Sequence, residues 1–240
     1  MPEHVEKIHE FSLRVRNARQ VCNSLENFVT YQLSRKSVTF SNMLQLELET
    51  QHAFQIISNN MTDEEFFRFC MANKVMRIER DKDRNIIVMP PVNTDSGEQE
   101  GDAIADVKYW ARKNGGRAYS SSAAFTLPNG AVRSPDTAWI HPDRFAKVPR
   151  SERSKFAAVV PDFIVEVRSK SDRLKVLKDK MVEWIENGVR LGWLIDPKTE
   201  TTYIYRANGG VEVIEGFDHT LTGEDVMKGF EFELKWMRNT

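Results

Sequence analysis

The 240-residue chain has few of the features that mark several common protein classes. Its only two cysteines, Cys22 and Cys70, lie far apart without a metal-binding spacing, which argues against a disulfide framework and indicates a reducing compartment. There is no run of roughly 18 apolar residues, and the N-terminus shows no basic-then-apolar leader. We therefore expect a cytoplasmic protein without a membrane span.

An excess of charge of one sign is also lacking. Lys and Arg number 34 against 35 for Asp and Glu, so any contact with nucleic acid would depend on local patches. The five histidines form no HExxH pattern, and the chain has neither a glycine-rich phosphate loop nor a nucleophile elbow. Zinc chemistry therefore has little support. The 40% of hydrophobic residues suits one sizeable domain with an appendage.

Residues 1–60 place apolar side chains at helical spacing and contain few glycines or prolines, which predicts two or three helices. These helices could form an arm that binds a partner or a layer on the following domain, and we favour the layer. Thr62 and Glu65 then have the spacing of a capping box, which predicts a helix ending near Asn73. We divide the chain into a helical N-terminal extension, residues 1–60, and one domain, residues 61–240.

The remaining sequence alternates between strand and helix patterns, which predicts an α/β (α+β) domain. The predicted strands are residues 75–80, 86–89, 118–127, 131–140, 163–167, 191–197, 202–205 and 211–214. The predicted helices are residues 102–113, after a polar loop at 96–101, and a helix capped by Ser171-Asp172 that runs to Glu186. Residues 143–155 form a basic stretch that reads equally as a solvated loop or as one that contacts phosphate.

Three acidic residues stand at or within the predicted strands. Glu166 interrupts the apolar run 163–167, and a buried carboxylate must be neutralised, paired with a cation or bound to a metal. Asp136 follows Pro135, which belongs at the beginning or edge of a strand, so Asp136 is predicted at a strand mouth. Glu79, at the end of the first hairpin, reads by itself as an exposed strand-end charge.

Basic residues lie close to Glu166 in sequence. Arg168 and Lys170 follow it at intervals of two, the spacing that places side chains on one face of a strand. The next helix offers Lys178 and Lys180 on opposite sides of its apolar stripe, and periodicity does not decide which turns toward the acids. Carboxylates are the ligands that Mg²⁺ prefers, and an adjacent lysine or arginine can orient the attacking water in phosphodiester cleavage.

Longer segments around these residues resemble a known family. The segments are 77–80, 87–91, 127–130, 133–136, 161–169 and 180–197, with a weaker echo at 223–226 and 229–230. They resemble the Uma-two family of restriction endonucleases, within the PD-(D/E)xK nuclease superfamily. The resemblance runs from about Thr62 to Trp236 and leaves the first sixty residues as an addition.

The resemblance implies a mixed β-sheet flanked by helices, the restriction-endonuclease-like core. It also implies that Asp136 and Glu166 bind the metal and that Glu79 is a third acidic contributor. The superfamily lysine normally stands two residues after the strand acid, where this chain has Arg168. In the Uma-two pattern that lysine lies on the next helix, eight residues before a Gly-Val pair, which selects Lys180 over Lys178.

Arg168 stays protonated and therefore cannot act as a base, although it can hold a phosphate oxygen. Together with it, we predict substrate-phosphate contacts from Lys170, Arg150 and Arg153. The predicted function is a Mg²⁺-dependent endonuclease acting on DNA, with Mn²⁺ as a substitute metal. Duplex cleavage favours a homodimer, because two active sites must meet two strands.

Two other readings remain open. The chain could be a catalytically degenerate nuclease fold that serves as a DNA- or protein-binding module. Alternatively, the acids could pair with Arg168 and Lys180 in a structural ion network.

Overall fold

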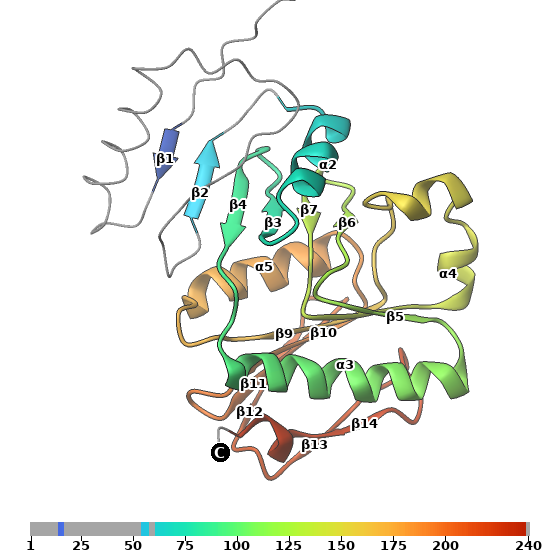
Figure 1. The fold of residues 1–240 in the computed structure, drawn as a ribbon. Helices are drawn as coiled ribbons and strands as arrows, with labels where there is room; N and C mark the ends of the chain where they lie inside the picture. Colours follow the sequence, from blue (N-terminus) through green and yellow to red (C-terminus); the bar gives the residue numbers. More distant parts are fainter. Residues whose placement is uncertain (1–13, 17–53, 58–60, 239–240) are drawn as a thin grey trace, which may run out of the picture. The chain divides into compact units, whose positions relative to one another are not determined.

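The computed structural model describes residues 14–16, 54–57 and 61–238 (Figure 1). The contacts divide the chain after Pro90 into two compact units, and each is described here by itself. In the part of the chain that is described, no helix is long and apolar enough to cross a membrane. Within residues 1–60 the structure describes only two short strands, β1 (Arg14–Arg16) and β2 (Phe54–Ile57). The rest of the segment in which helices were predicted lies outside the described residues. The domain boundary at residue 60 stays a prediction.

The N-terminal unit contains a helix and an antiparallel sheet. Strands β3 (Arg77–Arg80) and β4 (Ile86–Met89) form the predicted hairpin, and β4 also pairs with β2, which pairs with β1. Helix α2 (Asp63–Ala72) begins with the predicted capping box. The Thr62 hydroxyl accepts from the Glu65 amide at 3.2 Å, and the Glu65 carboxylate accepts from the Thr62 amide at 2.8 Å. The local sequence therefore determines where this helix begins.

A six-stranded mixed sheet organises the C-terminal unit. Its order is β12-β11-β10-β9-β8-β5, and the pair β9 and β10 is parallel while the other neighbours are antiparallel. A parallel pair needs a crossover connection, which helix α5 (Leu174–Glu186) provides. The strands are β5 (Arg117–Ser120), β8 (Thr137–Ile140), β9 (Phe163–Val167), β10 (Leu191–Asp196), β11 (Thr201–Arg206) and β12 (Val211–Glu215).

Shorter elements complete this unit. They are β6 (Phe125–Thr126), β7 (Val132–Arg133), α4 (Pro142–Ala146), β13 (Thr220–Thr222), β14 (Glu231–Glu233) and two 3₁₀ helices (Arg150–Ser154 and Leu234–Met237). The expected fold class, a mixed sheet flanked by helices, is confirmed.

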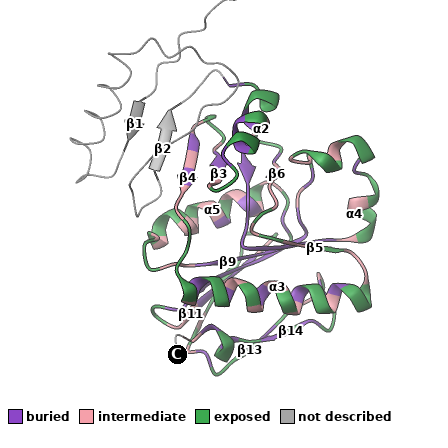
Figure 2. Cartoon of the chain, viewed as in Figure 1, coloured by how far each residue is buried: buried purple, intermediate pink, exposed green. Residues whose placement is uncertain are grey.

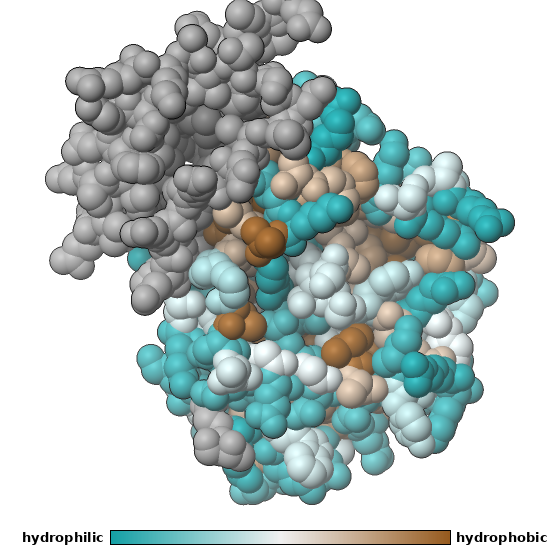
Figure 3. All heavy atoms as spheres, in the orientation of Figure 1, coloured by the Kyte–Doolittle hydropathy of each residue, from teal (hydrophilic) through white to brown (hydrophobic). Residues whose placement is uncertain are grey.

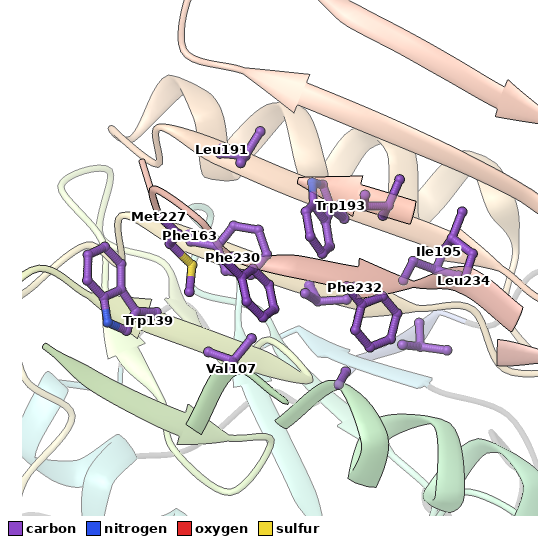
Figure 4. Close-up of a cluster of buried hydrophobic side chains, with 14 of the residues drawn as sticks. Val107, Trp139, Phe163, Leu191, Trp193, Ile195, Met227, Phe230, Phe232 and Leu234 are labelled. Carbon is purple, nitrogen blue, oxygen red and sulfur yellow. The ribbon is translucent and has the colours of Figure 1, made fainter. Parts of the chain in front are cut away.

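The two faces of this sheet bury different side chains, because residues along a strand alternate between faces. Phe163, Val165 and Val167 of β9 belong to a cluster with helix α3 (Thr94–Asn114) and the C-terminal segment, in which Trp193, Phe230 and Phe232 lie together (Figure 4). Ile164 packs on the opposite face with Met181 and Trp184 of α5. Strand β9 is buried along its whole length, whereas α3 is buried on one side only (Figure 2). Glu166 shares the face of Ile164, toward α5.

Several local predictions were wrong, among them the continuous strand 118–127, which is split into β5 and β6. The polar loop predicted at 96–101 is the first part of α3, because the Asn93 side chain caps the helix by accepting from the Ser96 amide at 2.9 Å. Neither Gly97 nor Gly101 has a positive φ, so neither glycine marks a turn. The basic stretch 143–155 contains α4 and a 3₁₀ helix rather than a loop alone.

The start of α5 also differs from the prediction. The helix begins at Leu174 after Arg173, without a side-chain cap. Asp172 instead accepts hydrogen bonds from the amide and the hydroxyl of Ser169, at 2.9 and 2.7 Å. Its carboxylate therefore closes the turn after β9 instead of capping the helix.

Candidate active site

Asp136 and Glu166 stand on neighbouring strands. Strands β8 and β9 are antiparallel with Thr137 opposite Val165, so one further step places Asp136 opposite Glu166. Residues opposite one another in such a pair point to the same face, with Cβ atoms about 4.5–5.5 Å apart. Both residues are buried, and Asp136 Oδ2 accepts from the Val167 amide at 2.7 Å. This hydrogen bond fixes the Asp136 carboxylate against the strand that carries Glu166.

Local sequence explains why the predicted strand is interrupted just before and at Asp136. Strands β7 and β8 are separated by Ser134, Pro135 and Asp136, where proline supplies no ladder donor. The Ser134 hydroxyl donates to the carbonyls of Ser121 or Ala123, each at 2.7 Å. The predicted strand 131–140 is thus interrupted at the position that turns Asp136 toward β9.

Lys180 of α5 joins the two acid-bearing segments. Its ammonium lies 2.8 Å from Glu166 Oε1 and 3.4 Å from the Ser134 carbonyl oxygen, and its side chain is only 10% exposed. Lys178 instead places its ammonium over the Tyr203 ring, 3.9 Å from the ring centroid. The structure therefore brings Lys180, not Lys178, to the carboxylates.

Two further residues of α5 contact the same region. The fully buried Trp184 donates from Nε1 to Glu166 Oε1 at 3.0 Å. Glu183 accepts from Arg133 Nε at 2.6 Å and from Asn129 Nδ2 at 3.0 Å, which ties the helix to the segment before Asp136. Neither residue is among the site residues predicted from the sequence. Their spacing from Lys180, three and four positions, is the signal that places them on the same side of the helix.

Arg168 and Lys170 lie beyond the end of β9 and form other ion pairs. Arg168 Nη1 lies 2.7 Å from Asp196 Oδ2, and its Nε donates to the Asp172 carbonyl at 3.2 Å. The exposed Lys170 ammonium lies 2.9 Å from Asp95 Oδ2, and this hydrogen bond lowers the pKa of the Asp95 carboxyl. Arg168 thus links the end of β9 to the end of β10. Its contact with phosphate stays a prediction.

The other predicted phosphate contacts lie on the 3₁₀ helix Arg150–Ser154. Arg153 donates from Nε and Nη2 to the Val148 carbonyl, at 3.2 and 3.0 Å, and lies over the Phe145 ring. Arg150 is exposed. Arg153 is therefore tied to its own loop, which leaves Arg150 as the more accessible cation of the two.

Glu79 belongs to the N-terminal unit, on β3 opposite Ile87 of β4. Its side chain is buried, with 2% of the residue exposed, so it is not the exposed strand-end charge that its own segment suggests. Its predicted part in metal binding stays a prediction.

The pair Asp136 and Glu166 has the donor atoms that a hard cation prefers. Within the described ranges no group of three or more His, Cys, Asp or Glu side chains is arranged to hold a metal ion. Mg²⁺, however, is commonly held by one or two carboxylates together with waters and substrate phosphate. The two carboxylates therefore fit a Mg²⁺ site that the substrate completes.

The surface around α3 is mostly hydrophilic, with small separate hydrophobic spots (Figure 3). Tyr109 is the main exposed aromatic residue of this helix, and the Lys113 ammonium lies over its ring. This helix face therefore presents no broad apolar area.

Comparisons with known proteins agree with this geometry. The family model Uma2, described as "Putative restriction endonuclease", matches residues 63–235. Among solved structures, the chain is similar to the crystal structure of a "putative nuclease belonging to DUF820" from Anabaena variabilis ATCC 29413, with a TM-score of 0.56 and 18% sequence identity. The similarity covers 67% of this chain and 88% of that one, and at this identity it concerns the fold. No curated protein matches the chain.

Proposed function

The chain belongs to the Uma2 family, and on that premise we propose that it is a Mg²⁺-dependent endonuclease that hydrolyses phosphodiester bonds in DNA. The family and the structural neighbour support a nuclease with a restriction-endonuclease-like fold. The observation that carries the finer proposal is the meeting of three side chains from three elements. Asp136 precedes β8, Glu166 lies on β9, and Lys180 on α5 is 2.8 Å from Glu166.

In this proposal Asp136 and Glu166 hold the metal, with Glu79 as a third acid. The bound Mg²⁺ would neutralise charge on the phosphate and lower the pKa of a bound water. The hydrogen bond from the Val167 amide holds Asp136 in a fixed orientation, and the burial of both acids keeps bulk water from competing for them. Their low exposure also strengthens every electrostatic interaction at the site.

Lys180 would act on the attacking water. Its ammonium carries three donors and can orient a water molecule or stabilise negative charge on a phosphate oxygen. It already contacts both Glu166 and the Ser134 carbonyl, so it reaches the same point as the carboxylates. Arg168, Lys170, Arg150 and Arg153 would contact phosphates of the substrate, and a homodimer would bring two sites to the two strands of a duplex.

A supercoiled plasmid tests this proposal, because a closed circle offers no ends to an exonuclease. We expect the purified protein to convert it to the open circular form with Mg²⁺ or Mn²⁺, and not in the presence of EDTA. Asp136→Asn should remove this activity while the variant melts at the temperature of the wild type. Equal cleavage by the variant and the wild type would disprove the assignment of Asp136.

One observation favours the second candidate, a binding module with a degenerate site. Glu166 is already paired with Lys180, as it would be in a purely structural ion pair. In that case the purified protein would retard DNA in a gel without cleaving it, whichever divalent cation is added. The plasmid assay and the gel retardation assay together separate the two candidates.

A further inference from the structure

Among the described residues, the buried indole of Trp184 makes one side-chain hydrogen bond, and its acceptor is the proposed metal ligand. The whole residue has 0% exposure, and its Nε1 donates to Glu166 Oε1 at 3.0 Å. The Lys180 ammonium approaches the same oxygen at 2.8 Å. Because two donors one helical turn apart meet a single oxygen, the Glu166 carboxylate can rotate only by giving up both contacts.

We propose that Trp184 is a positioning residue that orients Glu166 for metal binding. This inference rests on the proposed function, since it assumes that Glu166 is a metal ligand. Groups that hydrogen-bond to a metal ligand fix its orientation, and their removal typically lowers metal affinity or activity about 10–100-fold. Lys180 alone is a flexible chain, whereas the indole ring of Trp184 is held by the surrounding core.

A second tryptophan shows what a purely structural role looks like. Trp193 of β10 is 1% exposed and lies on the opposite face of the same sheet, against Phe163 and Phe230. Its Nε1 has no hydrogen-bond partner among the described residues. Buried indole nitrogens usually find an acceptor, so the contrast between the two residues identifies Trp184 as the one whose N–H has a specific partner. Trp193 thus contributes packing alone.

The matched variants are therefore Trp184→Phe and Trp193→Phe. Each replaces a buried indole by a smaller aromatic ring, but only the first removes a hydrogen bond to Glu166. Binding of Mn²⁺ alone would be measured by calorimetry, and the tryptophan fluorescence would be recorded along the same titration. We expect Trp184→Phe to bind Mn²⁺ about 10–100-fold more weakly. Trp193→Phe should bind it as the wild type does.

Fluorescence reports whether the bound Mn²⁺ lies near Trp184. Mn²⁺ bound at Glu166 changes the surroundings of the Trp184 indole, so the wild type and Trp193→Phe should show a metal-dependent change. Trp184→Phe should lose that change even at saturating metal. The melting temperature of each variant shows how far each substitution disturbs the fold.

The outcomes separate this inference from the function on which it rests. If the wild type binds Mn²⁺ and Glu166→Gln does not, the metal site stands. Wild-type Mn²⁺ affinity in Trp184→Phe would then overturn only the role of Trp184. An equal loss of affinity in both tryptophan variants would also overturn it, by assigning the effect to packing. Absence of Mn²⁺ binding by the wild type would overturn the inference and the metal-dependent function together.

Discussion

Two buried ion pairs stand near the end of β9, and they differ in what surrounds them rather than in distance. Glu166 and Lys180 approach to 2.8 Å, and Arg168 and Asp196 approach to 2.7 Å. Asp196 also accepts from the Lys198 amide at 3.1 Å, so its pair closes the turn that follows its own strand. Glu166 instead lies opposite a second carboxylate, Asp136, on the neighbouring strand segment. This neighbour decides which chemistry the buried pair can perform.

The cations of the two pairs also differ in kind. The Arg168 guanidinium is permanently charged and holds its acid and the Asp172 carbonyl in a fixed fork, which suits a structural bond. The Lys180 ammonium is a compact charge on a flexible chain, and its three donors can turn toward a water molecule or a phosphate oxygen. An arginine where the family resemblance places the superfamily lysine is therefore compatible with the proposed role of Lys180.

The largest expected effect is a loss of catalysis when Asp136, the neighbour of the Glu166–Lys180 pair, is changed. Asp136→Asn keeps an acceptor for the Val167 amide and removes the charge, so the fold should survive. We expect the rate of plasmid nicking to fall about 10²–10³-fold or more, the usual loss when one electrostatic group of an active site is removed. Single-turnover cleavage at saturating Mg²⁺ measures this. A rate within the error of the wild type would mean that the two pairs do not differ in function.

The matching substitution in the Arg168–Asp196 pair should lower the stability of the fold. Asp196→Asn leaves the buried Arg168 without its charged partner, which lowers the free energy of unfolding by about 3–5 kcal/mol. Urea denaturation measures the change, and the cleavage rate per folded molecule should stay at the wild-type value. If the variant is as stable as the wild type but inactive, Arg168 and Asp196 belong to the site.

Exchanging the cations sharpens the comparison further. Lys180→Arg preserves the charge beside Glu166 but replaces a compact ammonium by a larger, planar guanidinium, which should displace the contact with the attacking water and lower cleavage about 10²-fold. Arg168→Lys is the control, since it preserves the charge beside Asp196, and its cleavage rate should change little. Single-turnover cleavage at saturating Mg²⁺ measures both variants. A larger loss in Arg168→Lys than in Lys180→Arg would reverse the assignment of the two cations.

The smallest effect is expected at the exposed pair of Lys170 and Asp95. The Lys170 ammonium lowers the pKa of the Asp95 carboxyl, so Lys170→Ala should raise that pKa toward its ordinary value. The pair contributes to stability while Asp95 is ionised, and this contribution is lost as the pH falls through the lowered pKa. Carboxyl carbon NMR measures the titration of Asp95. The same variant should reduce the salt dependence of DNA binding by about one phosphate contact.

The central strands and helices were predictable, because their patterns are local. The apolar run at 163–167 and the capping box at Thr62 each specify their own structure. The start of α3 was missed because Gly97 and Gly101 resemble turn residues, while the cap that begins the helix is the single residue Asn93. A glycine in a helix interior costs about 1 kcal/mol relative to alanine, and the cap and the buried face of α3 outweigh that cost.

The site was predictable in its residues but not in its contacts. Alternation along β9 places Glu166 on a face, yet the partner of Glu166 depends on the register between β8 and β9 and on the rotation of α5. The helical periodicity did not decide whether Lys178 or Lys180 faces the acids, and the family resemblance was needed to choose between them. Arg168 was expected on the face of Glu166, but β9 ends before it and Asp196 binds it from the next strand.

In the proposed site, Asp136 and Glu166 together hold the metal that DNA cleavage requires. Anomalous diffraction from crystals soaked in Mn²⁺ can locate this ion. We predict a peak at roughly 2.1 Å from a carboxylate oxygen of each residue, the distance expected for a small hard cation. The peak should be absent in Asp136→Asn and unchanged in Asp196→Asn. A Mn²⁺ peak bound elsewhere, or one that persists in Asp136→Asn, would show that these two carboxylates do not form the metal site.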